Sequence, residues 1–227
     1  MNDDYNHSYT YYKKIIKIFR TIHIVWVGDE SKRPDSCINT WAQQNPDWKI
    51  RIWGNNELCS MEWKNSRHIN TMLNRELCGV ADLMRWEILS KHGGFAIDAD
   101  SICVRPLENW LFEADIFACW ENEICRPGLI ANGYVYSHPN NILINSIIDD
   151  IYDSNLDDDK LAWQLTGPTR ITDIVRKISY NNITIYPSHY FLPRHYTGIE
   201  YSGSGPVFAQ QFWGRALPNV YENLLQI

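Results

Sequence analysis

The chain has 227 residues, of which 44% are hydrophobic and 21% are charged, and its formal net charge is -6. This composition is that of an ordinary globular protein, and it excludes disordered and fibrous classes. The acidic balance disfavours unmodified nucleic acid as a partner, because a protein that binds a phosphate backbone needs a surplus of Lys and Arg on one face.

The chain shows neither a membrane-spanning pattern nor a metal-binding cysteine pattern. No stretch reaches the roughly 18 consecutive apolar residues of a transmembrane helix, so we predict no transmembrane segment and a cytoplasmic location. The six cysteines are scattered without CxxC spacing, which favours reduced thiols over a zinc site or a disulfide framework. The length fits one domain, residues 1–227.

The first part of the chain alternates strand and helix patterns. A β-branched and aromatic run at residues 22–27 stops at Gly28, which predicts a buried strand that ends in a turn. A helix is predicted over 36–44, a turn at Asn45-Pro46-Asp47, and a second strand over 48–53.

The middle of the chain predicts a long helix followed by a strand. Apolar residues recur at helical spacing from Leu77 to Ile88, and this pattern runs into Gly93-Gly94, a usual helix stop. A strand is predicted to follow over 95–104. Further along, the same signals predict helices over 142–151 and 171–178, the second opened by Gly167-Pro168-Thr169, and short strands at 116–119, 134–137 and 184–186. This alternation predicts an α/β fold with a sheet covered on both faces.

Asp98 and Asp100 are the first candidates for chemistry. Side chains two apart in a strand share a face, so we expect both carboxylates to point the same way, with Ile97 and Ala99 in the core. A divalent cation bound by oxygen ligands would relieve the repulsion between the two acids and could hold a diphosphate. Two acids suit Mg²⁺ or Mn²⁺, because these ions keep waters and accept phosphate oxygens.

Asp82 and Arg85 are the second pair. They lie three residues apart on the helix that precedes the aspartate strand, so they are neighbours on one face. One interpretation is an exposed salt bridge of little energetic value. The other is a pair that contacts a ligand, in which Asp82 accepts hydrogen bonds from hydroxyls and Arg85 supports a sugar or its phosphate.

The motifs, taken in order, resemble the DXD-containing sugar transferases of glycosyltransferase family 32. That family includes capsular polysaccharide transferases and fungal α-1,6-mannosyltransferases, and it is similar to the catalytic domain of large clostridial toxins. The matching segments are 21–28 (TIHIVWVG), Trp41, 45–48 (NPDW), 81–86 (ADLMRW), Gly93-Gly94 and 95–100 (FAIDAD). A weaker match continues through Asn132, Gly167-Pro168, Phe191, Pro193 and Phe212-Trp213.

The resemblance implies a GT-A type nucleotide-diphospho-sugar fold with a central mixed sheet flanked by helices. It implies a nucleotide-binding half over about 20–105 and an acceptor-side half over about 106–227. It also implies a divalent metal, Mn²⁺ or Mg²⁺, a nucleotide-sugar donor with UDP or GDP favoured, and retention of anomeric configuration. The acceptor would be a glycan, a lipid-linked precursor or another molecule.

The resemblance further implies roles for particular residues. Donor-binding residues are Val25, Trp26, Val27, Asp82, Arg85 and Asp98, with the Trp26 ring able to stack on the base; a core position for Trp26 is the alternative. Catalytic residues are Arg85, Asp98 and Asn132, with Asn132 as a polar contact to sugar or acceptor. Metal ligands are Asp98 and Asp100, with Gln211 as a further candidate. Many family members carry His near the Gln211 position, and Gln is a weaker, neutral ligand.

The expected mechanism is donor activation by charge neutralisation, in which the metal on the aspartates and Arg85 support the leaving diphosphate. A double displacement would instead need a protein carboxylate near the anomeric carbon. Glu121 and Glu123 are candidates for that role, although surface acids in a loop are the simpler interpretation. Two other functions remain open at this point: a metal-dependent phosphohydrolase and a non-catalytic carbohydrate-binding module.

Overall fold

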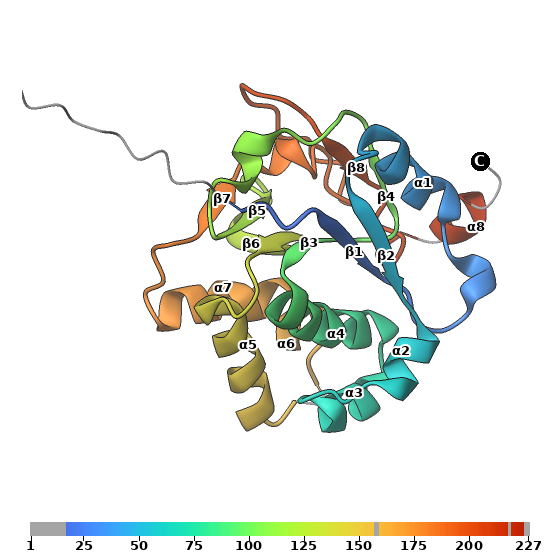
Figure 1. The fold of residues 1–227 in the computed structure, drawn as a ribbon, viewed down its shortest axis with the longest axis vertical. Coiled ribbons are helices and arrows are strands. Elements are labelled where there is room, and N and C mark those ends of the chain that lie inside the picture. Colours follow the sequence, from blue (N-terminus) through green and yellow to red (C-terminus); the bar gives the residue numbers. More distant parts are fainter. Residues whose placement is uncertain (1–16, 157–158, 218, 225–227) are drawn as a thin grey trace, which may run out of the picture.

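The centre of the molecule is a six-stranded sheet (Figure 1), seen in a computed structural model that describes residues 17–156, 159–217 and 219–224. The strand order is β2-β1-β3-β6-β5-β7. β1 runs parallel to β2 and β3, whereas β6 runs antiparallel to both β3 and β5, so the sheet is mixed as expected. The strands are β1 (Thr21–Val25), β2 (Lys49–Trp53), β3 (Gly94–Ile97), β5 (Ile116–Asn122), β6 (Arg126–Ser137) and β7 (Thr184–Tyr186).

The prediction of one continuous strand over 95–104 is wrong at its centre. The chain leaves the sheet after β3, and residues Ser101–Cys103 form a separate strand, β4, that pairs with β8 (Ala209–Gln211). Two hydrogen bonds shape the break: the Asp98 amide still donates to the Gly133 carbonyl at 3.1 Å, and the Ser101 hydroxyl donates to the Asp98 carbonyl at 2.8 Å. Asp98 and Asp100 therefore sit in a turn between two sheets.

Helices cover both faces of the sheet (Figure 1). The long helices expected from periodicity are all present, and the shorter α2, α3, α6 and α8 were not predicted. The helices are α1 (Asp35–Gln44), α2 (Asn55–Ser60), α3 (Ser66–Leu73), α4 (Leu77–His92), α5 (Ile142–Asp153), α6 (Ala162–Leu165), α7 (Pro168–Lys177) and α8 (Val220–Leu224). Three short 3₁₀ turns lie at η1 (Glu30–Lys32), η2 (Asn109–Phe112) and η3 (Ser188–Tyr190).

The two faces of the sheet bury two separate apolar clusters. Ala96 and Val135 face the cluster formed with α3, α4, α5, α6 and α7. Phe95 and Tyr134, on neighbouring positions of the same strands, face the cluster that includes α1 and the segment near Phe191. This alternation follows from the period of two in a strand. It places α4, the source of the Asp82–Arg85 pair, on one face with α6 and α7, and the later segment that contains Phe191 and Phe208 on the other.

The glycine pair after α4 ends the helix as predicted. Gly93 has a φ of 63°, and a Cβ there would lie 2.9 Å from the Ser137 carbonyl oxygen. Gly94 has a φ of 98°, and a Cβ there would lie 2.6 Å from the Thr21 carbonyl oxygen. A residue with a side chain would be strained at either position. The glycines therefore let α4 turn directly into β3, which fixes the position of Asp98 relative to Asp82 and Arg85.

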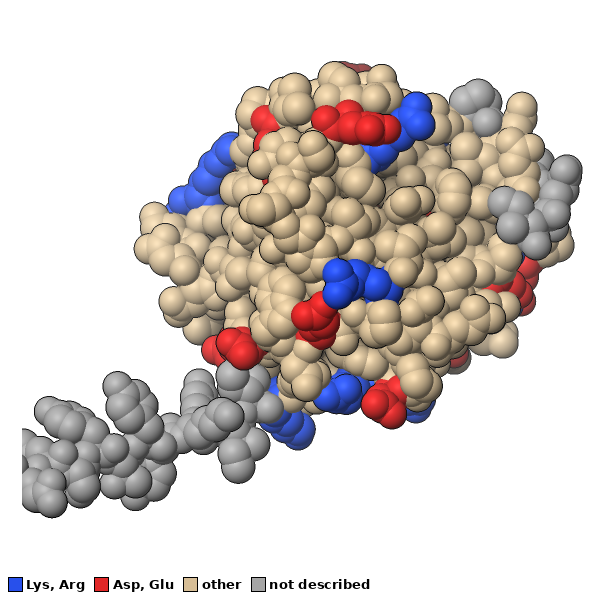
Figure 2. All heavy atoms as spheres, turned by 90° about the horizontal axis from the view of Figure 1, so that it is seen from above, with Lys and Arg blue, Asp and Glu red and all other residues tan. Residues whose placement is uncertain are grey.

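On the face drawn in Figure 2, charges are mixed rather than segregated. Lys and Arg side chains lie beside Asp and Glu side chains and form no continuous basic area on that face (Figure 2). Among the described residues, no helix has the length and apolar character that a membrane span requires.

His23 is a buried polar residue in the centre of β1. The Trp53 indole donates to His23 Nδ1 at 3.0 Å, so the ring proton sits on Nε2, which donates to the Gly93 carbonyl at 2.8 Å. Burial lowers the pKa of His23 to about 4, and the nearby His92 and Arg51 act in the same direction. His23 is thus held neutral, with its tautomer fixed by two hydrogen bonds.

We expect His23 to make folding sensitive to acid. The unfolded chain takes up a proton near pH 6.5, whereas the folded chain resists it down to about pH 4. This contribution to stability is therefore complete above about pH 6.5 and is lost as the pH falls toward 4. Between pH 7 and pH 4, urea unfolding of the wild type should lose about 3 kcal/mol more than that of His23→Gln, whose amide can make both hydrogen bonds. An equal loss in both proteins would contradict this assignment.

Candidate active site

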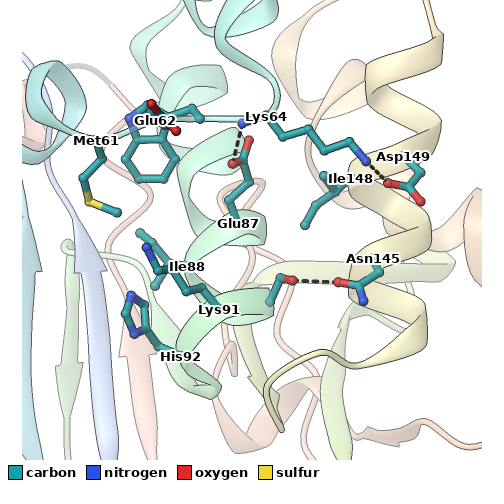
Figure 3. Close-up of a pocket in the computed structure, with 12 residues that line it drawn as sticks. Met61, Glu62, Lys64, Glu87, Ile88, Lys91, His92, Asn145, Ile148 and Asp149 are labelled. Carbon is teal, nitrogen blue, oxygen red and sulfur yellow. Dashed lines mark hydrogen bonds and ion pairs between the residues drawn. The ribbon is translucent and has the colours of Figure 1, made fainter.

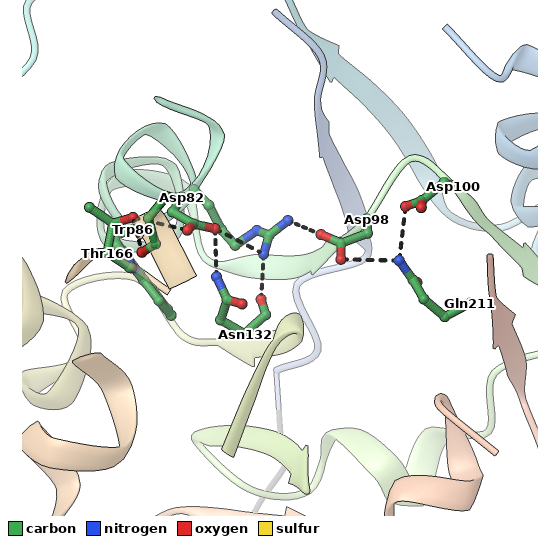
Figure 4. Close-up of polar contacts among 9 residues, drawn as sticks. Asp82, Trp86, Asp98, Asp100, Asn132, Thr166 and Gln211 are labelled. Carbon is green, nitrogen blue, oxygen red and sulfur yellow. Dashed lines mark hydrogen bonds and ion pairs between the residues drawn. The ribbon is translucent and has the colours of Figure 1, made fainter. Parts of the chain in front are cut away.

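Asp98 and Asp100 converge on one side chain from the other half of the chain. The amide nitrogen Nε2 of Gln211, on β8, donates to Asp100 Oδ1 at 2.8 Å and to Asp98 Oδ2 at 3.3 Å, as Figure 4 shows. The Tyr134 hydroxyl donates to Gln211 Oε1 at 2.8 Å and so holds the amide in this orientation. The two carboxylates do point toward a common position, as predicted. The cause is the turn after β3 and the β4–β8 pairing, whereas the prediction relied on the alternation of side chains in a strand.

The two acids differ in their surroundings. Asp100 is buried, and its Oδ2 accepts the Gly214 amide at 2.5 Å. Burial and the neighbouring Asp98 raise the pKa of Asp100 above its ordinary value. The Asp98 side chain is 34% exposed and forms an ion pair with Arg85. Asp98 is therefore the acid that is partly open to solvent and that contacts the Arg85 guanidinium on α4.

Arg85 joins the aspartate turn to α4 and β6. Its guanidinium Nη2 donates to Asp98 Oδ1, and Nη1 donates to the Asn132 carbonyl at 2.6 Å and lies 3.8 Å from Asp82 Oδ1. The Arg85 side chain is only 5% exposed. Its Nε is buried and has no hydrogen-bond partner within the described residues. One buried guanidinium thus contacts three elements and keeps one unused donor.

Asp82 is held by hydrogen bonds to both of its oxygens. Asn132 Nδ2 donates to Oδ1 at 2.6 Å, and the Thr166 hydroxyl donates to Oδ2 at 3.0 Å (Figure 4). The Trp86 indole fixes Thr166 in turn by donating to its carbonyl at 2.8 Å. Burial raises the pKa of Asp82 to about 6, although Arg85 acts in the opposite direction. The interpretation of Asp82 and Arg85 as an exposed salt bridge is wrong, because both residues are buried.

Trp26 follows the end of β1 and is partly buried. Its indole nitrogen donates to the Asp29 carbonyl at 3.0 Å, while its neighbours Val25 and Val27 are buried in the core. The ring of Tyr221, on α8, packs edge-on against Trp26 with the ring centroids 5.3 Å apart. Sequence reasoning did not find Tyr221, because nothing in the local pattern links residues so far apart.

The two candidate nucleophiles have structural partners. The interpretation of Glu121 as a surface loop acid is wrong: it is buried on β5, 3.2 Å from His195 Nε2 and 3.7 Å from Arg126 Nε. Burial raises the pKa of Glu121 and lowers the pKa of His195 to about 4. Glu123 accepts the Ser188 amide at 2.8 Å and also the Ser188 hydroxyl. Both acids thus already have bonding partners.

A cavity of about 400 Å³ lies elsewhere on the molecule, between α4, α5 and the segment 61–64 that links α2 to α3 (Figure 3). Its lining includes Lys64, Glu87 and Asn145, and it shares no residue with the Asp82, Asp98 and Asp100 cluster. Glu87 accepts the amides of Lys64 and Asn65 at 2.8 Å, so it caps the start of α3. This cavity is therefore separate from the site formed by the sequence motifs.

Solved structures share this fold. The PaToxG glycosyltransferase matches with a TM-score of 0.59 and 18% identity over 71% of this chain and 70% of that one. The UDP-bound glycosyltransferase domain from the YGT toxin matches with a TM-score of 0.53 and 9% identity over 73% and 79%. The apo glycosyltransferase GlyE of Streptococcus pneumoniae TIGR4 gives 0.51 and 9% over 92% and 60%. At these identities the likeness establishes the fold, which is GT-A.

Residues 31–117 match the family described as glycosyltransferase sugar-binding region containing DXD motif. The chain is a GT-A type glycosyltransferase. The matched region contains Asp82, Arg85, Asp98 and Asp100, so the predicted resemblance is confirmed. No curated protein sequence matches the chain significantly.

The residues of this glycosyltransferase fit a divalent cation at the aspartate turn. Two carboxylates already converge on one donor, the Gln211 amide, which stands where a cation shared by both acids would be held. Within the described ranges, no third His, Cys, Asp or Glu joins them. A pair of acids with open positions for water and phosphate oxygens suits Mg²⁺ or Mn²⁺ better than an ion that needs a full protein cage.

Thr166 provides a test of the network around Asp82. Thr166→Val removes a hydroxyl that donates to a buried carboxylate and keeps the side-chain shape. We expect urea unfolding to show a loss of about 1–3 kcal/mol, because a buried acceptor loses a partner. Thr71→Val is the matched control: the Thr71 hydroxyl bonds only the Arg67 carbonyl on the surface of α3, and the change should stay within about 0.5 kcal/mol. Equal effects would show that the Asp82 network adds nothing.

Proposed function

We propose that this glycosyltransferase is a retaining enzyme that uses a nucleotide-diphospho-sugar donor and a divalent metal, Mn²⁺ or Mg²⁺. The acceptor in this proposal is a glycan or a lipid-linked glycan precursor. The observation that carries the proposal is the convergence of Asp98 and Asp100 on a single position beside the buried Arg85 guanidinium. Because the chain is assigned as a transferase, the two alternative functions, a metal-dependent phosphohydrolase and a carbohydrate-binding module, are no longer favoured.

The aspartates and Gln211 would hold the metal. Bound there, a divalent cation supplies Lewis-acid stabilisation of negative charge on a diphosphate. Asp98 and Asp100 provide two carboxylate oxygens on one side, and Gln211 can offer its amide oxygen if the amide turns. The hydrogen bond from Tyr134 to Gln211 Oε1 governs that turn, because the same hydroxyl can accept from the amide nitrogen instead.

Arg85 is the residue best placed to support the leaving diphosphate. Its guanidinium is buried and held in place by Asp82, Asp98 and the Asn132 carbonyl. The positive charge therefore needs no rearrangement as negative charge develops nearby. Its unpartnered Nε is an additional donor. Asp82, oriented by Asn132 and Thr166, keeps lone pairs that can accept hydroxyl groups of the donor sugar.

In this proposal Val25, Trp26 and Val27 form the base-binding end of the donor site. Val25 and Val27 are fixed in the core, and the intervening Trp26 ring is only partly buried, which suits stacking on a base. The proposal needs no protein nucleophile. Glu121 and Glu123 are engaged with His195 and Ser188, which favours front-face transfer over a double displacement.

Thermal unfolding with UDP, GDP, CDP or dTDP, each with Mn²⁺ or with a chelator, tests donor and metal together. A nucleotide at about 100 times its dissociation constant adds about 2.7 kcal/mol, which for this size raises the Tm by roughly 5–10 °C. We expect this rise with one nucleotide, only with metal, and only when both aspartates are present. The Asp98→Asn, Asp100→Asn double variant should show none. A rise that persists in that variant or with chelator would refute metal dependence.

Gln211→Glu tests the third ligand. A third carboxylate beside Asp98 and Asp100 should lower the Tm without metal through repulsion and enlarge the rise that Mn²⁺ produces. Gln210→Glu is the matched control, because Gln210 is the adjacent, exposed residue of β8 and no hydrogen bond links it to either aspartate. It should change neither quantity. If both variants respond alike to Mn²⁺, Gln211 is not a ligand position.

A further inference from the structure

The C-terminal strap, defined as residues 214–217 and 219–224, contacts both the Trp26 ring and the aspartate turn. Its helix α8 carries Tyr221, whose ring meets the Trp26 ring edge-on, with an angle of 86° between the ring planes. The Tyr221 ring also packs against Gly214, where a Cβ would lie 2.5 Å from two ring atoms. Gly214 is the residue whose amide donates to Asp100. One aromatic ring thus extends from the base-stacking tryptophan to the aspartate turn.

Burial and electrostatics agree with this placement. Burial raises the pKa of the Tyr221 hydroxyl, and the negative charges that add most to this effect are those of Asp100 and Asp98. A nucleotide diphosphate with its base on Trp26 and its phosphates at the two aspartates would have to occupy the space that the Tyr221 ring fills. The Tyr221 ring and the proposed nucleotide therefore compete for the same space.

After Gly214, the described residues of the strap make few polar contacts with the body. Ser36, on α1, donates its hydroxyl to the Leu224 carbonyl at 3.1 Å. Arg215 pairs with Glu76 at 2.9 Å, but its side chain is 66% exposed, so this pair contributes little. The Tyr221 hydroxyl makes no hydrogen bond within the described residues. The part of the strap after Gly214 can separate from the body while the Gly214 amide stays bonded to the buried Asp100.

The backbone supports a hinge at the start of the strap. Trp213, the residue before it, has a φ of 59°, and Asn219, just before α8, has a φ of 57°. Asn tolerates this left-handed conformation, whereas for a bulky residue such as Trp it costs about 1–2 kcal/mol. Strain of this kind is held only by surrounding contacts and is released when the segment changes position.

We propose that the strap is an autoinhibitory element that closes the donor site of the free enzyme, with Tyr221 occupying part of the nucleotide's place. The inference rests on the proposed function, because it assumes that the nucleotide binds between Trp26 and the aspartate turn. Donor binding then requires the strap to open. The apparent affinity is reduced by the fraction of molecules that are open.

Titration calorimetry with Mn²⁺ and each of the four nucleoside diphosphates tests this closure. If about one molecule in ten is open, Tyr221→Ala should bind the preferred nucleotide about tenfold more tightly than the wild type. Tyr221→Phe keeps the ring and loses only an unbonded hydroxyl, so it should bind within about twofold of the wild type. Tm values without nucleotide show whether each variant is folded.

Two further variants keep Tyr221 and loosen only the strap. Ser36→Ala removes the anchor to the Leu224 carbonyl, and Arg215→Gln removes the pair with Glu76. Each should tighten nucleotide binding in the same direction as Tyr221→Ala, by a smaller factor of about two to four, because each anchor shifts the open fraction by under 1 kcal/mol. These variants decide the question even if Tyr221→Ala does not fold.

The outcomes separate the two proposals. Tighter binding by Tyr221→Ala and by the anchor variants supports closure by the strap. Weaker binding by Tyr221→Ala would make Tyr221 part of the base pocket and would overturn the closure. Equal binding by all variants would also overturn the closure. In both cases the proposed function would stand. Absence of nucleotide binding in every protein, including the folded Tyr221→Ala variant, would overturn the proposed function and the closure with it.

Discussion

The buried guanidinium of Arg85 is the interaction on which the rest of the site depends. A charge removed from water is tolerated only when it is paired and hydrogen-bonded. Arg85 meets that requirement through Asp98, the Asn132 carbonyl and, more distantly, Asp82. Removing any of these partners would leave a buried charge without full compensation. The chain is therefore constrained to bring α4, the turn after β3, and β6 together.

This constraint explains why the surrounding residues are so closely bonded. Asp82 must stay close to Arg85, and it is held by Asn132 and Thr166. Thr166 is positioned in turn by Trp86, one residue after Arg85 on α4. This series of hydrogen bonds thus begins at Asp82 on α4 and ends at Trp86 on the same helix. A closed network of this kind fixes its side chains before a substrate arrives, and such preorganisation makes electrostatic stabilisation effective.

The local parts of this arrangement could be predicted from the sequence, and the long-range parts could not. Helical periodicity placed Asp82 and Arg85 on α4, and the Gly93-Gly94 stop placed Asp98 just beyond it. Periodicity says nothing about where a strand leaves its sheet. The break at Asp98 depends on the Gly133 carbonyl and on the pairing of β4 with β8, more than 100 residues away.

The remaining site residues show the same limit. Thr166 and Tyr134 carry no local signal of function, because each acts through one hydrogen bond to a residue distant in the chain. Gln211 was predicted only because a family resemblance pointed to that position. Burial also reversed two interpretations: Asp82 and Glu121 look like surface acids in the sequence, and the fold encloses both.

The charge of the site affects how ligands enter it. Asp82, Asp98 and Asp100 bring three acids against the single cation of Arg85, so the fully ionised site has an excess of two negative charges. Burial is the main cause of the raised pKa values of Asp82 and Asp100, and the negative charge of the neighbouring Asp98 adds to it. A nucleotide diphosphate would add further negative charge and would be repelled. In the proposed function, cation and nucleotide therefore bind with positive cooperativity, each raising the affinity for the other by the same factor.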